Sequence, residues 1–360
     1  MEKKYVLAIN PGSTSTKVSL FEGLTEYKSK KLDHLTEDLD RFDDIYSQYD
    51  YRLEIINNWL EEERISIEEL EAVVGRGGLL MPIPSGTYAV TDAMIEDLKI
   101  GVQGQHASNL GGILAKGIAD KAGIPSFIVD PVAVDEFEDI ARISGLKDLP
   151  RTSLIHALNI KAVCHRFSKE YNQPVDELNI IVTHMGGGIS VAPIENGKIV
   201  DANGANNLGP FSPERAGGLP VWDIVEMCYS GDYEEGQIKK MIVGKGGLVS
   251  YLGTFDGREV VSRIENGDEE ARLIYDAMAY QIGKEIGAYS TVLKGKATAI
   301  LLTGGLAFSE YLVDKIKQMV SFIAPVVVYP GEDEMTSLNE GARRVLSGSE
   351  KAKIYEDEVR

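Results

Sequence analysis

Two segments in different halves of the chain share one local pattern, and this duplication constrains the fold more than any other feature. An apolar strand, a turn rich in glycine and hydroxyl side chains, and a second strand follow one another in VLAINPGSTSTKVSLF (residues 6–21). The same order recurs in NIIVTHMGGGISVAPIENGKIVDANG (residues 179–204). Backbone N–H groups of such turns are suited to phosphate binding. The repeat therefore predicts a duplicated nucleotide-binding fold with the ligand held between its halves.

The composition favours a globular protein of two domains and disfavours several kinds of partner. The chain has 360 residues, of which 43% are hydrophobic, so it can bury two cores. Its 37 basic and 56 acidic residues give a formal charge of −19, which would repel nucleic acid and an anionic membrane surface. No apolar run approaches the roughly 20 residues of a membrane span. Cys164 and Cys228 lack a metal-binding spacing, so we expect reduced core thiols and a cytoplasmic protein.

The order of elements predicts an α/β architecture. Helical spacing is expected over residues 51–63, 106–122, 152–171, 219–228 and 269–293, with a last helix that includes 342–346, and short strands over 72–74, 126–129 and 299–302. Asp130 follows one of these strands, at the edge where α/β folds collect ligands. We expect an N-terminal domain of residues 1–150 plus 337–360 and a C-terminal domain of residues 151–336.

Several motifs in this order resemble those of one family. They are INPGSTSTK, VVGRGG, GQHASN, VDPVAVDEF, PRTSLIHALNIKAV, VTHMGGGISVA, GPFSPERAGGLP and YPGEDEM. Together they resemble the acetate and butyrate kinase family of the actin-like and sugar-kinase-like ATPases, and they look closer to the butyrate kinases. The resemblance implies a duplicated ribonuclease H-like α/β fold with an interdomain cleft. It also implies an acyl site in the N-terminal domain and a nucleotide site in the C-terminal domain.

The activity implied by this resemblance is reversible phosphorylation of butyrate by ATP, giving butyryl phosphate and ADP by direct in-line transfer. Magnesium and a homo-oligomer are implied as well. Kinases of branched-chain fatty acids such as isobutyrate, of propionate or of acetate are the close alternatives. A sugar kinase and a non-catalytic actin-like ATPase are more distant ones. A sugar kinase would need a general-base aspartate, whereas a carboxylate acceptor is already ionised at neutral pH.

The acyl site is assigned through the motif VVGRGG. Arg76 resembles the family arginine that binds the substrate carboxylate, a role that suits a guanidinium fork. The glycines around it would let the ligand approach the backbone, although an arginine in such a turn could also be a surface residue. His106 resembles a family histidine near the acyl group, with a structural role at a helix N-terminus as the alternative. Asp130 corresponds to an active-site aspartate that orients an arginine or positions the substrate.

Two departures from the acetate kinases predict a wider acyl pocket. Those enzymes carry valine where this chain has Gly78 and phenylalanine where it has Ile155. The smaller side chains predict a preference for butyrate or a branched acid, because each extra buried methylene contributes about 0.8 kcal/mol. Refilling of the space by neighbouring side chains is the alternative.

Groups for the phosphoryl transfer are also assigned through the resemblance. His156 matches the transition-state histidine, and Arg215 matches the arginine that stabilises the transferring phosphoryl group. A helix histidine among apolar neighbours, such as His156, could instead be a core residue. The phosphate-facing residues are expected to be Asn10, Ser13, Thr14, Lys17, His184, Gly186, Gly187 and Gly188. An ordinary polar hairpin is the alternative for the first of these segments.

The remaining assignments concern the metal and the nucleotide base. Asn10 is expected to help hold magnesium, together with Asp333 or Glu334, although a surface acidic turn is the alternative. Asp256, Arg258, Gly304 and Gly305 match positions that wrap adenosine. The segment departs from acetate kinases at Ala307 and Phe308, where those enzymes have Glu-Asn. No Walker pattern is present. His34 and His165 match no family position and are expected to be solvated.

Overall fold

The computed structural model describes residues 4–206 and 208–359, and it divides into two compact units. Unit 1 comprises Met1–Asp135 and Asp333–Arg360, and unit 2 comprises Glu136–Glu332. The domain boundaries expected from the sequence, near residues 150 and 336, lie later in the chain than these. Residues 136–150 belong with unit 2 because Glu136 forms a buried ion pair of 2.8 Å with Lys161. The Glu138 N–H also donates to the Val200 carbonyl.

Unit 1 is built on a seven-stranded sheet with the order β12-β5-β6-β4-β1-β2-β3. Its strands are β1 (Tyr5–Pro11), β2 (Ser15–Glu22), β3 (Thr25–Asp33), β4 (Leu70–Arg76), β5 (Thr87–Ala89), β6 (Ser126–Val129) and β12 (Lys353–Ile354). β1 pairs antiparallel with β2 and parallel with β4, which in turn pairs parallel with β6. β1 and β4 are almost continuously apolar and buried, as expected of parallel strands covered on both faces.

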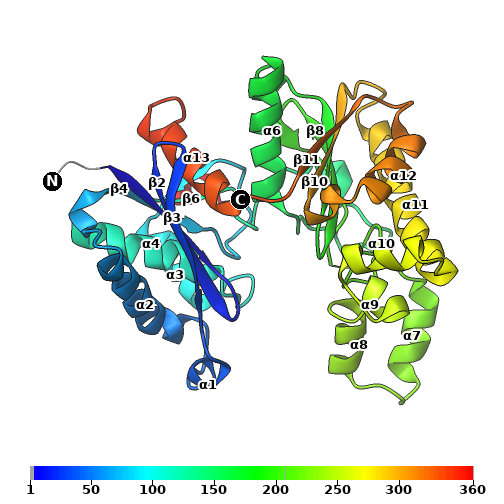
Figure 1. Ribbon diagram of the computed structural model, residues 1–360, viewed down its shortest axis with the longest axis horizontal. Coiled ribbons are helices and arrows are strands. Elements are labelled where there is room, and N and C mark those ends of the chain that lie inside the picture. The colour runs from blue at the N-terminus through cyan, green and yellow to red at the C-terminus, as the bar shows by residue number, and fades with distance from the viewer. Residues whose placement is uncertain (1–3, 207, 360) are drawn as a thin grey trace. The chain divides into compact units, whose positions relative to one another are not determined.

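Helices cover both faces of this sheet. They are α1 (Thr36–Leu39), α2 (Tyr49–Glu62), α3 (Asp92–Ile100), α4 (Asn109–Ala122), α13 (Glu334–Leu346) and α14 (Tyr355–Glu358). Figure 1 shows α2, α3 and α4 on one side of the strands and α13 on the other. α4 packs on β4, and α13 packs on β1 and β6. The core between the sheet and α4 includes Leu7, Ile9, Val73 and Leu114.

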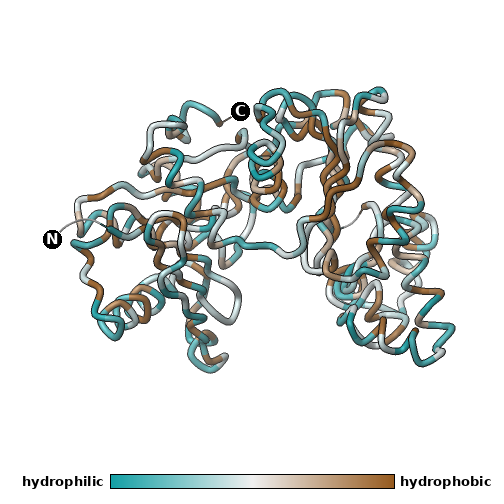
Figure 2. Tube along the Cα trace, turned by 45° about the horizontal axis from the view of Figure 1, so that its top comes forward, coloured by the Kyte–Doolittle hydropathy of each residue, from teal (hydrophilic) through white to brown (hydrophobic). Residues whose placement is uncertain are grey.

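Unit 2 is built on a five-stranded sheet with the order β11-β10-β7-β8-β9. Its elements are α5 (Asp139–Arg142), α6 (Ala157–Tyr171), β7 (Ile180–Met185), β8 (Ile189–Glu195), β9 (Lys198–Ile199), α7 (Val221–Tyr229), α8 (Glu235–Ile242), α9 (Gly247–Leu252), α10 (Gly257–Glu265), α11 (Glu269–Val292), β10 (Ala299–Gly304), α12 (Glu310–Val320) and β11 (Val326–Pro330). α6 lies on one side of the sheet, with α11 and α12 on the other (Figure 1). Figure 2 shows the apolar residues concentrated in the strands of this sheet.

The two sheets have the same arrangement at their centres, which confirms the predicted duplication and fold class. In unit 1 the order β3-β2-β1-β4-β6 places the first hairpin beside a parallel strand. In unit 2 the order β9-β8-β7-β10-β11 does the same. β1 and β7 are thus equivalent, and each is followed by a tight turn into an antiparallel strand. The duplication in the sequence is therefore a duplication of topology.

Some local expectations were wrong. The helix expected from residue 106 begins at Asn109, and the helix expected from 152 begins at Ala157, so His156 lies outside it. Cys164 is buried but Cys228 is exposed. His34 is buried, and its Nε2 lies 2.8 Å from Thr16 Oγ1. These differences arise because tertiary packing sets helix ends and burial.

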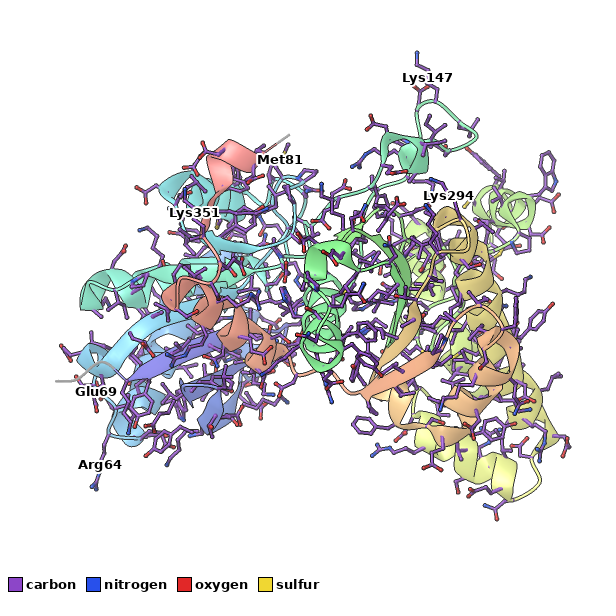
Figure 3. All side chains as sticks on the ribbon, turned by 90° about the horizontal axis from the view of Figure 1, so that it is seen from above. Arg64, Glu69, Met81, Lys147, Lys294 and Lys351 are labelled. Atoms are coloured by element: carbon purple, nitrogen blue, oxygen red, sulfur yellow. The ribbon has the colours of Figure 1, made fainter. Side chains whose placement is uncertain are left out.

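Residues 145–150 of the loop between α5 and α6 are exposed, and Lys147 projects from this loop (Figure 3). Among the described helices, none is long and apolar enough to cross a membrane.

Candidate active site

Three predicted site residues of unit 1 lie at one edge of its sheet. Asn10 is near the C-terminal end of β1, Arg76 is the last residue of β4, and Asp130 directly follows β6. These strands are parallel neighbours, so their C-terminal ends meet at the same edge. Lys17 lies directly opposite Asn10 in the β1–β2 pair and is exposed. No described carboxylate forms an ion pair with Lys17, so its charge remains available for an anion.

Glu334, the first residue of α13, connects two of these side chains. Its Oε2 accepts a hydrogen bond of 2.5 Å from Asn10 Nδ2, and its Oε1 forms an ion pair with Arg76 Nη1. The Arg76 side chain is only 15% exposed. A largely desolvated guanidinium of this kind binds carboxylates strongly. The carboxylate that Arg76 contacts in this structure is that of Glu334, a residue of the protein itself.

The neighbouring Asp333 has a different role. Its two carboxylate oxygens accept from the Thr336 N–H (3.0 Å) and the Thr336 hydroxyl (2.6 Å), so it caps the N-terminus of α13. Among the described residues, no cluster of three or more His, Cys, Asp or Glu side chains could hold a metal. Magnesium keeps several waters and needs only one or two protein oxygens. The adjacent Glu334 carboxylate and Asn10 amide fit that sparse requirement.

The glycines around Arg76 serve packing rather than ligand approach. A Cβ on Gly78 would lie 2.6 Å from the Cα of Asn109, and one on Gly77 would lie 2.8 Å from the Cα of Pro131. A Cβ on Gly75 would collide with the backbone of α4. The close approach of β4 and the following turn to α4 and to Pro131 therefore requires glycine here. Replacing a valine by Gly78 does not by itself enlarge an acyl pocket.

His106 precedes α4 and has one ring nitrogen engaged. Its Nδ1 lies 2.7 Å from the Ser108 hydroxyl and accepts from the Ser108 N–H at 3.2 Å. That leaves Nε2 as the protonated nitrogen of the neutral ring. Burial, followed by the charge of Arg76, lowers the pKa of His106. A neutral imidazole near the guanidinium is the result.

Asp130 is buried and holds a loop. Its Oδ1 accepts from the Gly86 N–H at 2.8 Å, and its own N–H donates to the Gly86 carbonyl. Its φ of 39° lies in the left-handed region, which aspartate tolerates better than most residues. These contacts give Asp130 a role in fixing the loop that contains Gly86 beside the Arg76 edge.

Two histidines of unit 2 stack on each other. The rings of His156 and His184 have centroids 3.9 Å apart and an interplanar angle of 15°. His156 Nδ1 lies 2.9 Å from the Ser190 hydroxyl, and His184 Nδ1 lies 2.8 Å from Asn159 Oδ1. His184 Nε2 lies 3.6 Å from Glu332. The stack is thus fixed from both sides.

Arg215 lies against the glycine turn that follows β7. A Cβ on Gly188 would lie 2.6 Å from the Arg215 Cζ, so only glycine lets the guanidinium approach this closely. Arg215 Nη1 donates to the Ala205 carbonyl at 2.9 Å, and burial lowers the pKa of Arg215. The turn is closed by a hydrogen bond from the Gly186 N–H to the Gly188 carbonyl. The same turn contacts His184 through Gly186. His156, His184 and Arg215 therefore form one cluster.

A cavity of about 1080 Å³ opens beside this turn within unit 2. Of the predicted nucleotide-binding residues, its lining includes Gly186, Gly187, Asp256, Arg258 and Gly305. Phe255 and Phe308 also line it and are 64% and 70% exposed. Exposed aromatic rings at the wall of such a cavity suit stacking against a base. Its volume exceeds the usual range for drug-sized ligands, so a nucleotide fits.

Three of the predicted nucleotide-binding residues have structural contacts of their own. Arg258 pairs with Asp256 through two hydrogen bonds of 3.0 and 2.7 Å, and this contact lowers the pKa of Asp256 to about 2. Gly304 lies outside the cavity lining; its φ of 88° and its approach to the Met185 backbone exclude other residues.

The groups that orient the histidines were not among the predicted site residues. Asn159, Ser190 and Glu332 lie within the quoted motifs, but none carries a distinctive pattern of its own. Asn159 follows His156 by three residues and would share a helical face with it, which was the only available signal.

Duplicated ribonuclease H-like units, with a glycine-rich turn beside an arginine and paired histidines, define an actin-like phosphotransferase. A family model described as the acetokinase family matches residues 149–352, and the chain belongs to this family.

Full-length relatives agree with this classification. "Probable butyrate kinase 2" of Caldanaerobacter subterraneus subsp. tengcongensis is 58% identical over 350 residues, covering 97% of this chain and 99% of the relative. "Butyrate kinase 2" of Clostridium acetobutylicum is 52% identical over 351 residues, covering 97% of this chain and 99% of the relative. The crystal structure of Porphyromonas gingivalis acetate kinase matches with a TM-score of 0.80 and 21% identity, covering 95% of this chain and 100% of that one. The last match supports the fold alone.

Proposed function

We propose that the protein is a kinase of short-chain fatty acids that transfers the γ-phosphoryl group of ATP to butyrate, reversibly giving butyryl phosphate and ADP. The observation that carries the proposal is the contact of Arg76 with a carboxylate at the sheet edge of unit 1. Family membership supplies the chemistry, and the butyrate kinase names of the relatives favour butyrate over acetate.

In this proposal, residues of unit 1 bind the acid and residues of unit 2 bind the nucleotide. Arg76 binds the carboxylate of the acid, with His106 and Asp130 close to that edge. The cavity of unit 2 takes the nucleotide, with Phe255 and Phe308 at the base and Gly186 and Gly187 toward the phosphates. Its size and aromatic wall support this assignment.

The reaction needs alignment and charge stabilisation more than acid–base chemistry. The acceptor carboxylate is ionised at neutral pH, so no side chain has to remove a proton from it. Arg215 and the protonated nitrogen of His156 donate to the phosphoryl oxygens as negative charge develops on them. Ser190 and the stacked His184 hold the His156 ring in place. A rigid donor of this kind stabilises the transition state without reorganising.

A magnesium ion would be held by Glu334 and Asn10, and when bound it would neutralise charge on the phosphates. Asp333 is committed to capping α13. We assign the metal contact to Glu334 for that reason.

Acyl-chain preference rests on fewer observations. Ile155 is 4% exposed, so a side chain at this position contributes to a packed interior. Gly78 is explained by its contact with Asn109. The preference for butyrate or a branched acid is therefore proposed from the relatives alone.

The direct test is a panel of straight and branched carboxylates from two to five carbons, with acyl phosphate trapped by hydroxylamine. We expect the highest kcat/KM for a four-carbon acid. Absence of acyl hydroxamate with every acid, in folded protein supplied with ATP and magnesium, would overturn the proposed function.

We also propose a cytoplasmic homo-oligomer, since ATP is the phosphoryl donor and α7 presents an apolar surface. Val221, Trp222 and Tyr229 are 76%, 78% and 87% exposed. Light scattering of wild type and Trp222→Glu tests this, and a monomeric wild type would contradict it.

A further inference from the structure

We propose that Arg52 is a positioning residue for phosphate binding: it holds the carbonyls of the β1–β2 turn inward, so that amides of the turn face the phosphoryl group. This rests on the proposed function, because the phosphoryl group would come from ATP, and the motif INPGSTSTK predicts that Ser13 and Thr14 of this turn face its phosphates. Arg52 belongs to no motif of the family resemblance and lies in α2.

Arg52 is fully buried, with 0% exposure, and it is surrounded by acceptors that are not carboxylates. Its Nη1 donates to the Gly12 carbonyl (2.9 Å), to Thr16 Oγ1 (3.0 Å) and to the Ser15 carbonyl (3.3 Å). Its Nη2 donates to the Ser13 carbonyl at 3.4 Å. Nε and Nη2 donate to Gln48 Oε1. Every nitrogen of the guanidinium is therefore used to hold neutral oxygens, mostly those of the turn.

The direction of these carbonyls fixes the direction of two amides. In a trans peptide the C=O and N–H bonds point in opposite directions. Because the Gly12 carbonyl faces Arg52, the Ser13 N–H must point away from it, and the Ser13 carbonyl sets the Thr14 N–H in the same way. Ser13 and Thr14 are exposed, and within the described residues neither N–H donates to another group. Two neighbouring amides directed outward form an anion-binding arrangement.

The charge of Arg52 adds to this arrangement. A buried cation without a carboxylate partner destabilises a fold by several kcal/mol unless something compensates for its desolvation. In the described residues no acidic side chain pairs with Arg52, although the chain has 56 acidic residues. An anion bound on the outer side of the turn would interact with this positive charge across a medium of low dielectric constant. The exposed Lys17 lies on the strand that leaves the same turn and adds a second positive charge.

Arg52 is the charged member of this hydrogen-bond network, because its neighbours Thr16 and His34 are uncharged at neutral pH. Thr16 Oγ1 accepts from Arg52 and lies within hydrogen-bond distance, 2.8 Å, of His34 Nε2. Burial and the charge of Arg52 lower the pKa of His34 to about 4. The imidazole is thus uncharged at neutral pH.

The test compares ligands with and without phosphates. Titration calorimetry would give the affinities of ATP, inorganic tripolyphosphate and adenosine for wild type, Arg52→Met and Arg52→Lys. We expect Arg52→Met to weaken binding of ATP and tripolyphosphate by about tenfold or more, with adenosine unchanged. Lysine keeps the charge but cannot form the guanidinium fork, so Arg52→Lys should show a smaller loss.

Arg343→Gln is the matched control. Arg343 Nε donates to the Gly23 carbonyl at 3.1 Å, in the turn at the opposite end of β2. This variant removes an arginine that holds a turn in the same unit, and it should bind all three ligands as wild type does.

Two results would overturn the inference: unchanged affinity for ATP in Arg52→Met, or an equal loss for ATP and adenosine. If Arg52→Met does not fold, Arg52→Lys decides by the same ratio of ATP to adenosine affinity, and an unchanged ratio rejects the inference. The proposed function fails separately, by a lack of acyl phosphate from wild type with every acid.

Discussion

The carboxylate of Glu334 lies against the guanidinium of Arg76, at the edge where β1 and β4 end. Its second oxygen accepts from Asn10. A fatty acid that binds Arg76 must therefore compete with a carboxylate of the protein. Any cation that binds Glu334 weakens this competition, so metal binding and acid binding should favour one another.

Replacement of Glu334 by glutamine should separate these two effects. Without the competing charge, the metal-free variant should bind butyrate more tightly than metal-free wild type, by about tenfold. The magnesium concentration that gives half-maximal velocity should rise. Calorimetric titration of butyrate with and without magnesium measures the first effect, and steady-state kinetics measures the second.

Asp333→Asn is the control for this experiment. It removes the charge of the neighbouring carboxylate, which caps α13, but asparagine caps helices about as well as aspartate, so stability and butyrate affinity should both stay close to those of wild type. Weaker butyrate binding to metal-free Glu334→Gln would contradict the competition.

Substitutions in the cluster of His156, His184 and Arg215 in unit 2 should lower kcat more than they change KM. His156→Ala and Arg215→Ala should each lower kcat by about two orders of magnitude or more, with a smaller change in KM, because both groups are assigned to the transition state. Steady-state kinetics of variants with native circular dichroism tests this. Near-normal turnover in either variant would remove that residue from the mechanism.

Gly78 should matter for stability before it matters for substrate choice. A valine there would meet the backbone of Asn109, so Gly78→Val should lower the free energy of unfolding by about 1 to 3 kcal/mol.

Gly287, inside α11, has no neighbouring atom within 4 Å of its would-be Cβ. Gly287→Ala should therefore stabilise the protein by about 0.5 to 1 kcal/mol. Urea unfolding measures both, and a stable Gly78→Val enzyme with altered chain preference would restore the pocket interpretation.

His34 should make stability depend on pH. Its pKa is about 4 in the folded protein, lowered by burial and by Arg52, and near 6.5 when unfolded. Between these values the unfolded state binds more protons, so stability is complete above pH 6.5 and falls as the pH is lowered toward 4. Urea unfolding should show a loss on the order of 1 to 2 kcal/mol from pH 7 to 5 that is absent in His34→Gln. Identical slopes for the two proteins would show that His34 does not contribute.

The fold was largely predictable because its signals are local. Apolar runs around β1, β4, β7 and β10 and the repeated glycine-rich turns identify the strands and their duplication. Helix ends were less accurate: His156 was assigned to a helix, but it precedes α6 with a ψ of 59° that is not helical. Such ends depend on side-chain packing as well as on local propensity.

The sequence by itself determined the residue types available for the chemistry, and the order of motifs led to the prediction that Arg76, His156 and Arg215 take part in it. Only the tertiary structure decided what each of them contacts. It shows that Glu334 contacts Arg76 whereas the neighbouring Asp333 caps α13. It also shows that Gly78 packs against Asn109. It also placed the buried Arg52 under the β1–β2 turn. These contacts join residues far apart in the chain, and their energies depend on distance and burial, which no local pattern records.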